Sequence, residues 1–116
     1  MTEREYQTPC YIIDEEKLLK DFNMLKDSLE ASWNHYRIGY SFKTNSLPWL
    51  VTFLKEKGVM AEVVSDDEYA LARWLAFKES EIIYNGPVKE RTSFERALLA
   101  GGIVNLDGRR ELDWLE

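Results

Sequence analysis

The chain is organised around the stretch Tyr40-Ser41-Phe42-Lys43-Thr44-Asn45, in which a lysine ends a strand-like run just before a turn. From residue 37 to residue 43 the side chains alternate in size, as in a strand that places them on opposite faces. Lys43 shares its face with Gly39 and Ser41, so that face is nearly empty. A buried cation needs a carboxylate or a ligand beside it. We expect a ligand to occupy the space around Lys43.

A lysine in such a cavity would be a nucleophile. Desolvation lowers the pKa of a lysine, and the neutral amine forms a Schiff base with carbonyl compounds such as an aldehyde cofactor. The alternative is that Lys43 leaves the strand end and extends into solvent. The residues around Lys43 do not separate these two hypotheses, so the wider sequence has to decide.

From residue 37 onwards the sequence alternates between strand and helix patterns. The predicted strands are residues 37–43, 61–65, 81–85 and 103–106. The predicted helices begin at Ser46, at Asp66 or Asp67, at Thr92 and at Arg109. This alternation predicts a parallel sheet covered by helices. A short strand at residues 10–13 and a helix capped by Asp14 precede it. That helix carries one apolar stripe, formed by Leu18, Leu19, Phe22, Leu25, Leu29 and Trp33.

This pattern is compatible with two α/β architectures. A doubly wound sheet that binds a nucleotide has a glycine-rich first turn, which the sequence lacks. A (β/α) barrel instead turns its strand ends toward an active site. Polar residues recur at these ends: Lys43, Glu62 with Ser65, Asn85, and Asn105 with Asp107. Four strand–helix units are about half of a TIM-type barrel. We therefore expect residues 1–116 to be a single domain, the amino-terminal portion of such a barrel in a truncated protein, with open edges that favour self-association.

Composition narrows the class of protein. The net charge of −6 and the dispersed basic residues argue against nucleic acid and anionic membranes as partners. The single cysteine, Cys10, excludes an internal disulfide and supports a reducing, cytoplasmic setting, and no His–Cys cluster suggests a metal site. No run approaches the length of a membrane span. His35 is interpreted as a surface loop residue.

Five collinear blocks resemble one enzyme family. They are residues 8–14, residues 40–46, residues 61–65 with Glu68, residues 82–89 and residues 105–107. In order and spacing they resemble the amino-terminal part of the pyridoxal-phosphate-dependent diaminopimelate, ornithine and arginine decarboxylases. The resemblance extends from about Thr8 to Leu115. It implies an alanine-racemase-like barrel followed by a β domain.

The resemblance also implies a cofactor site. Lys43 corresponds to the family lysine that carries pyridoxal 5'-phosphate as an internal aldimine. Glu62 stands where the family usually has Asp beside the cofactor, and Ser65, Glu68 and Asn85 fall in blocks that line it. The implied substrate is a basic or diamino amino acid, and the implied assembly is a homodimer. The family's phosphate loop follows in later strands, so we expect the isolated chain to have little or no decarboxylase activity.

Two alternatives stay open at this point. The chain could belong to a racemase or a cofactor-carrier protein of the same cofactor class. It could also be a non-catalytic homologue that keeps the fold to bind a protein partner. The lysine on a face of small residues argues against the second alternative, because a purely structural barrel fills its interior with Val or Ile.

Overall fold

The computed structural model describes residues 6–116, which fall in two compact units, Met1–Tyr36 and Arg37–Glu116. The first unit contains helix α1, Glu15–Glu30. Asp14 caps it as predicted, because its side chain accepts a hydrogen bond of 2.9 Å from the backbone N–H of Lys17. None of the helices in residues 6–116 is long and apolar enough to cross a membrane.

Two predictions about the first unit are wrong. Residues 10–13 are not a strand, because within residues 6–36 no neighbouring strand pairs with their backbone. A β-type sequence needs such a partner. The apolar stripe of α1 is also narrower than predicted. Phe22 is buried, whereas Leu25 and Trp33 are exposed.

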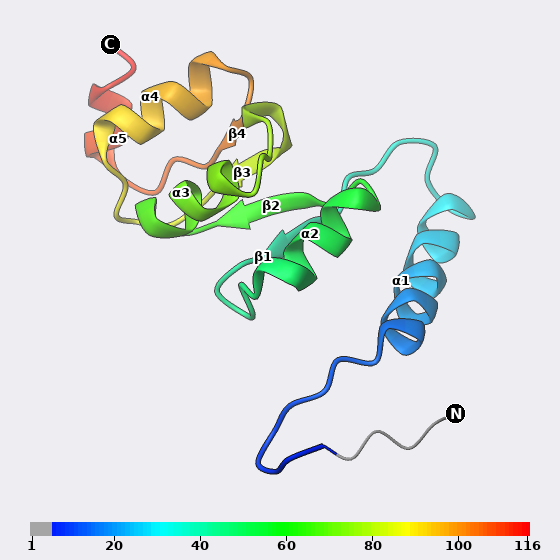
Figure 1. Ribbon diagram of the computed structural model, residues 1–116. Helices are drawn as coiled ribbons and strands as arrows, with labels where there is room; N and C mark the ends of the chain where they lie inside the picture. The colour runs from blue at the N-terminus through cyan, green and yellow to red at the C-terminus, as the bar shows by residue number, and fades with distance from the viewer. Residues whose placement is uncertain (1–5) are drawn as a thin grey trace. The chain divides into compact units, whose positions relative to one another are not determined.

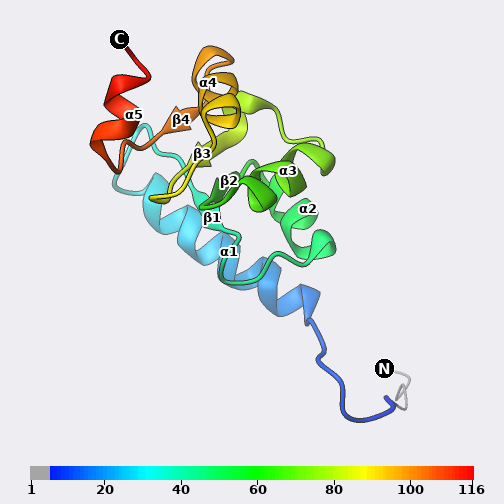
Figure 2. The same cartoon turned by 90° about the vertical axis from the view of Figure 1, so that its left-hand side faces the viewer.

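The second unit is a four-stranded parallel sheet in the order β1-β2-β3-β4. The strands are Gly39–Ser41 (β1), Met60–Val63 (β2), Ile82–Tyr84 (β3) and Ile103–Val104 (β4). The helices between and after them are Pro48–Glu56 (α2), Asp66–Trp74 (α3), the 3-10 turn Glu79–Glu81 (η1), Arg91–Leu99 (α4) and Arg109–Asp113 (α5). Figures 1 and 2 show the strands side by side in chain order, with α2, α3 and α4 along one side of them.

This topology favours the barrel over the doubly wound sheet. A doubly wound sheet reverses its strand order and places helices on both faces. Here the order never reverses, and the buried core forms where the helices cover one face of the sheet. Residues 6–116 form an open sheet rather than a closed barrel. The prediction of four parallel strand–helix units is confirmed.

The core lies between one face of the sheet and the helices. Its largest fully buried side chains are Tyr84 on β3, Phe77 before η1 and Phe42 after β1. Phe42 and Phe77 meet edge to face, with ring centroids 6.0 Å apart. Tyr84 stacks on Tyr69 of α3 at 5.1 Å. These aromatic contacts fix the helix-covered face and leave the opposite face free to carry polar groups.

The helix starts differ in detail from the predictions. The residue that caps α2 is Leu47, whose N–H donates to Asn45 Oδ1, and Ser46 is not the cap. Ser65 caps α3 in place of Asp66 or Asp67. Serine satisfies a free N–H of the first turn, while the acidic residues that follow it favour the positive end of the helix dipole.

Candidate functional site

Lys43 lies in a tight turn at the carboxyl end of β1. The N–H of Thr44 donates to the carbonyl of Ser41 at 3.1 Å, which closes a turn over residues 41–44. The strand therefore ends at Ser41, two residues earlier than predicted, and Lys43 is exposed. The expectation that a cavity in this chain encloses Lys43 is wrong. Its amine is open to solvent at the strand end.

The turn that carries Lys43 is held on both sides. The N–H of Phe42 donates to the carbonyl of Glu62 at 2.9 Å, which extends the pairing of β1 with β2 by one residue. The hydroxyl of Tyr40 donates to the carbonyl of Asn45 at 3.1 Å. The backbone around Lys43 is thus fixed, while its exposed side chain makes no hydrogen bond or ion pair with any other residue in 6–116.

The face of the sheet opposite the helices carries small and polar side chains together with large apolar ones. Parallel register pairs Ser41 with Glu62 and Glu62 with Ile83, so these residues share one face. Gly39 lies on this face too, and a Cβ atom placed there would lie 2.7 Å from Ile83 Cδ1. The close approach needs glycine. The side chains that β1 places on this face are small, as predicted, but the prediction that the face is nearly empty is wrong, because Ile83 of β3 fills the space at Gly39.

A chain of side-chain hydrogen bonds joins the carboxyl ends of three successive strands. Asn85 Nδ2, after β3, donates to Glu62 Oε1 of β2 at 2.8 Å. Asn105 Nδ2, after β4, donates to Asn85 Oδ1. We call Glu62, Asn85 and Asn105 the rim chain. Polar strand ends do converge on one edge of the sheet, as the sequence predicted, and the rim chain fixes the direction of the Glu62 carboxylate.

Ser65 and Glu68 form a reciprocal cap at the start of α3. The N–H of Glu68 donates to Ser65 Oγ at 3.2 Å, and the N–H of Val64 donates to Glu68 Oε2 at 2.9 Å. This pair resembles a capping box, except that the backbone donor to Glu68 is Val64 and not Ser65, and it shapes the turn that follows β2. Both side chains are therefore occupied within the chain. They lie beside the rim chain without joining it.

Asp66, the next acidic residue, also has a structural role. Its carboxylate accepts from the hydroxyl of Tyr84 at 2.7 Å and from the N–H of Glu90 at 3.0 Å. Burial, together with the hydrogen bond to Asp66, raises the pKa of Tyr84 above its ordinary value. Burial and a hydrogen bond of 2.6 Å to Glu79 likewise raise the pKa of Tyr69. Both phenols stay neutral near neutral pH.

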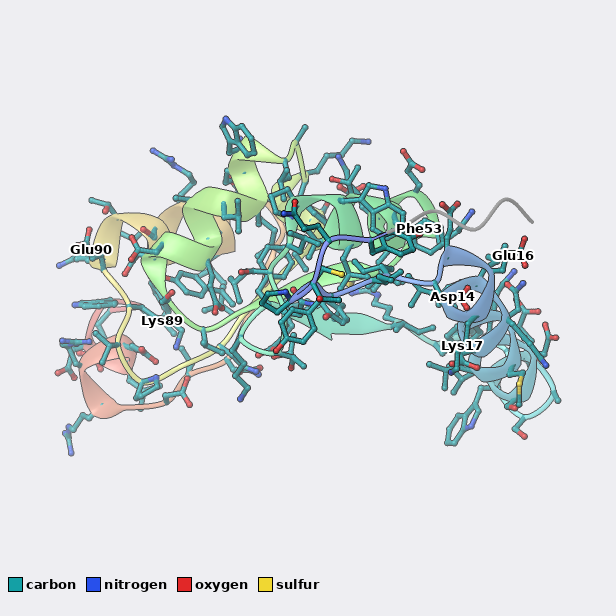
Figure 3. The ribbon with its side chains drawn as sticks, turned by 60° about the horizontal axis from the view of Figure 1, so that its bottom comes forward. Asp14, Glu16, Lys17, Phe53, Lys89 and Glu90 are labelled. Carbon is teal, nitrogen blue, oxygen red and sulfur yellow. The ribbon has the colours of Figure 1, made fainter. Side chains whose placement is uncertain are left out.

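Sequence reasoning missed Lys89, which follows the turn after β3. Its side chain is 0% exposed and pairs with Asp107 at 2.8 Å and with Glu111 at 3.1 Å. Figure 3 labels Lys89 on the segment that leads into α4. One signal could have found this cluster, since Asp107 and Glu111 are carboxylates four residues apart after the fourth strand, opposite a lysine after the third.

One polar atom beside Lys43 offers a test of the cofactor site. Ser41 Oγ is buried and has no hydrogen-bond partner within residues 6–116. Buried hydroxyls without partners are rare in native proteins. The strand ends thus offer the hydroxyl of Ser41, the exposed amine of Lys43 and the oriented carboxylate of Glu62. These groups fit a small polar molecule with a reactive carbonyl. The residues at the end of β1 thus fit a pyridoxal-type group.

A parallel sheet with strands in chain order and polar groups at their carboxyl ends is typical of part of a (β/α) barrel, a class of proteins that bind ligands at that rim. Residues 15–116 match the family model described as the pyridoxal-binding domain of pyridoxal-dependent decarboxylases. The chain belongs to this family. The resemblance inferred from the sequence is confirmed, and the cofactor of the family is pyridoxal phosphate.

Individual relatives agree with this assignment. The chain is 28% identical to diaminopimelate decarboxylase of Methanothermobacter thermautotrophicus over 108 residues, which are 93% of this chain and 25% of that protein. It is 30% identical over 98 residues to an L-glutamyl acyl-carrier protein decarboxylase of Niallia circulans, covering 84% of this chain and 22% of that protein. Diaminopimelate decarboxylase from Helicobacter pylori, solved in complex with L-lysine, matches with a TM-score of 0.76 at 26% identity, over 96% of this chain and 28% of that one.

The chain spans about a quarter of the length of the curated relatives it matches. These relatives are named decarboxylases, which favours that class over the racemase or carrier alternative. The contacts among the described residues form two compact units, so the assignment of residues 1–116 to one barrel domain stays a prediction.

Proposed function

We propose that the chain is the amino-terminal part of a pyridoxal-phosphate-dependent decarboxylase of a basic or diamino amino acid, and that Lys43 holds the cofactor. The observation that carries this proposal is the position of Lys43. Its exposed amine lies at the carboxyl end of β1 in a chain of a pyridoxal-binding family, beside the hydroxyl of Ser41, which has no hydrogen-bond partner among the described residues. When bound, pyridoxal phosphate supplies an electron sink for the bond that breaks on decarboxylation.

In this proposal each residue at the rim has a separate task. Lys43 provides the amine that binds the aldehyde carbon of the cofactor covalently. Ser41 Oγ provides a hydrogen-bond donor or acceptor at the same strand end. Glu62 presents a carboxylate whose direction Asn85 fixes through the 2.8 Å hydrogen bond. A carboxylate held in this way orients a cationic group without moving during the reaction.

Ser65 and Glu68 would contribute to the cofactor site by shaping it. Their reciprocal cap fixes the turn after β2, where the backbone leaves the rim. Both side chains already hydrogen-bond within the chain. We therefore propose that Ser65 and Glu68 position the turn, and that Lys43 and Ser41 contact the cofactor directly. Asn85 joins the site through Glu62.

The substrate class is supported by the relatives. Several of them are named diaminopimelate decarboxylases, and the Helicobacter pylori enzyme was solved with L-lysine. The Niallia circulans relative acts, by its name, on a glutamyl group instead. We therefore propose a diamino acid as substrate, with a homodimeric enzyme in the cytoplasm as its setting. The single cysteine supports that reducing setting.

Covalent trapping tests the role of Lys43. The purified chain is mixed with pyridoxal phosphate, its absorbance spectrum is recorded, and borohydride reduction followed by peptide mapping locates the label. We expect the label on Lys43 and its loss in Lys43→Arg, which keeps the charge but removes the nucleophilic amine. Lys20→Arg, a change at an exposed lysine of α1, is the matched control and should label like the wild type.

Two results would contradict the proposal. Label spread evenly over surface lysines, unchanged in Lys43→Arg, would show that Lys43 has no special affinity for the aldehyde. Complete lack of label would favour the alternative of a non-catalytic homologue that binds a protein partner.

A further inference from the structure

Lys89 is the most completely enclosed charged side chain among the residues described. Its ammonium group contacts three oxygen atoms, which belong to the Gly86 carbonyl, Asp107 Oδ2 at 2.8 Å and Glu111 Oε1 at 3.1 Å. An ammonium group has three N–H donors. Every donor of Lys89 is therefore used, and its three partners come from the segments that follow β3 and β4.

On the β3 side, Lys89 holds the turn that directly follows Asn85 of the rim chain. Gly86 comes directly after Asn85 and has a φ of +95°, in the region that favours glycine. A Cβ atom at Gly86 would lie 2.3 Å from the carbonyl oxygen of Val64. The turn after β3 is thus pressed against the segment after β2. The hydrogen bond from Lys89 to the Gly86 carbonyl secures it there.

On the β4 side, the same ammonium group holds the segment that follows Asn105. Asp107 lies two residues beyond Asn105, and its N–H donates to Glu111 Oε2 at 2.7 Å. Glu111 thus uses one oxygen for Lys89 and the other for the backbone at Asp107. The carboxylate of Glu111 is 2% exposed, so water does not compete for either contact.

We propose that Lys89 is a positioning residue for the rim chain. It fixes the spacing between the carboxyl ends of β3 and β4, so that Asn105 and Asn85 stay in contact. This contact in turn directs the Glu62 carboxylate. A hydrogen bond between two amides weakens steeply once its atoms separate beyond the normal range. A small shift of either strand end would therefore break the contact between Asn105 and Asn85 and leave the Asn85 amide free to turn away from Glu62. The importance of Glu62 for the cofactor rests on the proposed function, whereas the geometric role of Lys89 does not.

Nuclear magnetic resonance of the side-chain amides tests this proposal without any cofactor. In Lys89→Met combined with Glu111→Gln, the two buried side chains lose their charges but keep similar shapes. Only the Asp107 carboxylate, which is 35% exposed, keeps its charge, and this limits the loss of stability. We expect the side-chain amide signals of Asn85 and Asn105 to move toward the positions of free asparagine. Their exchange with water should become about tenfold faster, as expected when one hydrogen bond is lost.

The matched control is the ion pair between Arg73 and Glu79, which also joins a cation to a buried carboxylate, at 3.0 Å, but does not touch the rim chain. Arg73→Met combined with Glu79→Gln should leave both amide signals in place. If the Lys89 double variant fails to fold, Asp107→Ala serves instead, because Asp107 is 35% exposed and its loss is easier to tolerate. Amide signals that stay in place in the folded variants would overturn the proposal.

Trapping of pyridoxal phosphate separates this inference from the proposed function. If both hold, the Lys89 double variant binds the cofactor at Lys43 more weakly than the Arg73 control does. If the amide signals move but the wild type never labels at Lys43, the positioning role of Lys89 stands and the proposed function fails. If the wild type labels at Lys43 and the amide signals do not move, the proposed function stands and the role of Lys89 fails.

Discussion

Lys43 and Lys89 follow β1 and β3 of the same sheet in opposite environments. Lys89 is fully enclosed and each of its N–H donors meets an oxygen atom. Lys43 is exposed on a fixed turn, next to the Ser41 hydroxyl, for which the described part of the chain supplies no partner. A lysine whose donors are all used supports the structure, whereas a lysine with free donors is available to a ligand. Burial alone would point to Lys89, although the donors of that lysine are all used within the chain.

The largest expected effect is a difference in the free energy of unfolding between variants of the two lysines. Lys89→Met leaves the Glu111 carboxylate buried without its cation, which should lower the free energy of unfolding by about 3–5 kcal/mol. Lys43→Met removes an exposed side chain and should change it by less than about 0.5 kcal/mol. Urea unfolding followed by circular dichroism measures both. Equal losses in the two variants would remove the contrast between the two lysines.

A second prediction concerns the turn next to Lys89. Gly86→Ala should lower the free energy of unfolding by about 2–3 kcal/mol, because the left-handed φ is costly for alanine and its Cβ would meet the carbonyl of Val64. Gly58 also has a positive φ but has open space around it, so Gly58→Ala is the matched control and should cost about 1 kcal/mol. A smaller loss at Gly86 than at Gly58 would mean that the turn after β3 is loosely held.

The third prediction uses pH to probe the helix-covered side near Lys89, whose ammonium group lies 5.7 Å from the centre of the Tyr84 ring. Burial raises the pKa of Tyr84 in the folded chain above its value of about 10 in the unfolded chain. Folding therefore disfavours the phenolate. The stabilisation is complete below about pH 10 and decreases as pH rises toward the folded pKa, by about 1.4 kcal/mol per pH unit.

Urea unfolding at several alkaline pH values checks this slope. Tyr84→Phe should be less stable at neutral pH, because it loses the hydrogen bond to Asp66, and its stability should fall less steeply above about pH 10. An identical slope in Tyr84→Phe and the wild type would show that this phenol does not titrate with unfolding.

The smallest expected effect concerns the helix caps near the rim. Ser65→Ala should lower the free energy of unfolding by about 1 kcal/mol, because Ser65 Oγ accepts from the first turn of α3. Ser46→Ala is the matched control, since Ser46 does not cap α2, and should have an effect below about 0.5 kcal/mol. Thermal unfolding of both variants gives the comparison. A larger effect at Ser46 would mean that α2 begins earlier than Leu47.

The sequence by itself determined the order of the elements and the family. Strands and helices leave periodic patterns that depend on neighbouring residues, so the four strand–helix units and the cap at Asp14 could be predicted. Polar residues after successive strands predicted the shared rim, because parallel strands end at the same edge of a sheet. The family blocks around Lys43 identified the cofactor class.

Only the tertiary structure decided which side chains are enclosed. Burial depends on residues that are distant in sequence, as when Glu111 encloses Lys89 from 22 positions away. The strand predicted at residues 10–13 failed for a related reason, since a strand requires a partner and local composition does not supply one. Lys43 is exposed because a backbone hydrogen bond turns the chain at Ser41. Periodicity is a local property of the sequence, whereas enclosure and strand pairing arise only when distant segments meet.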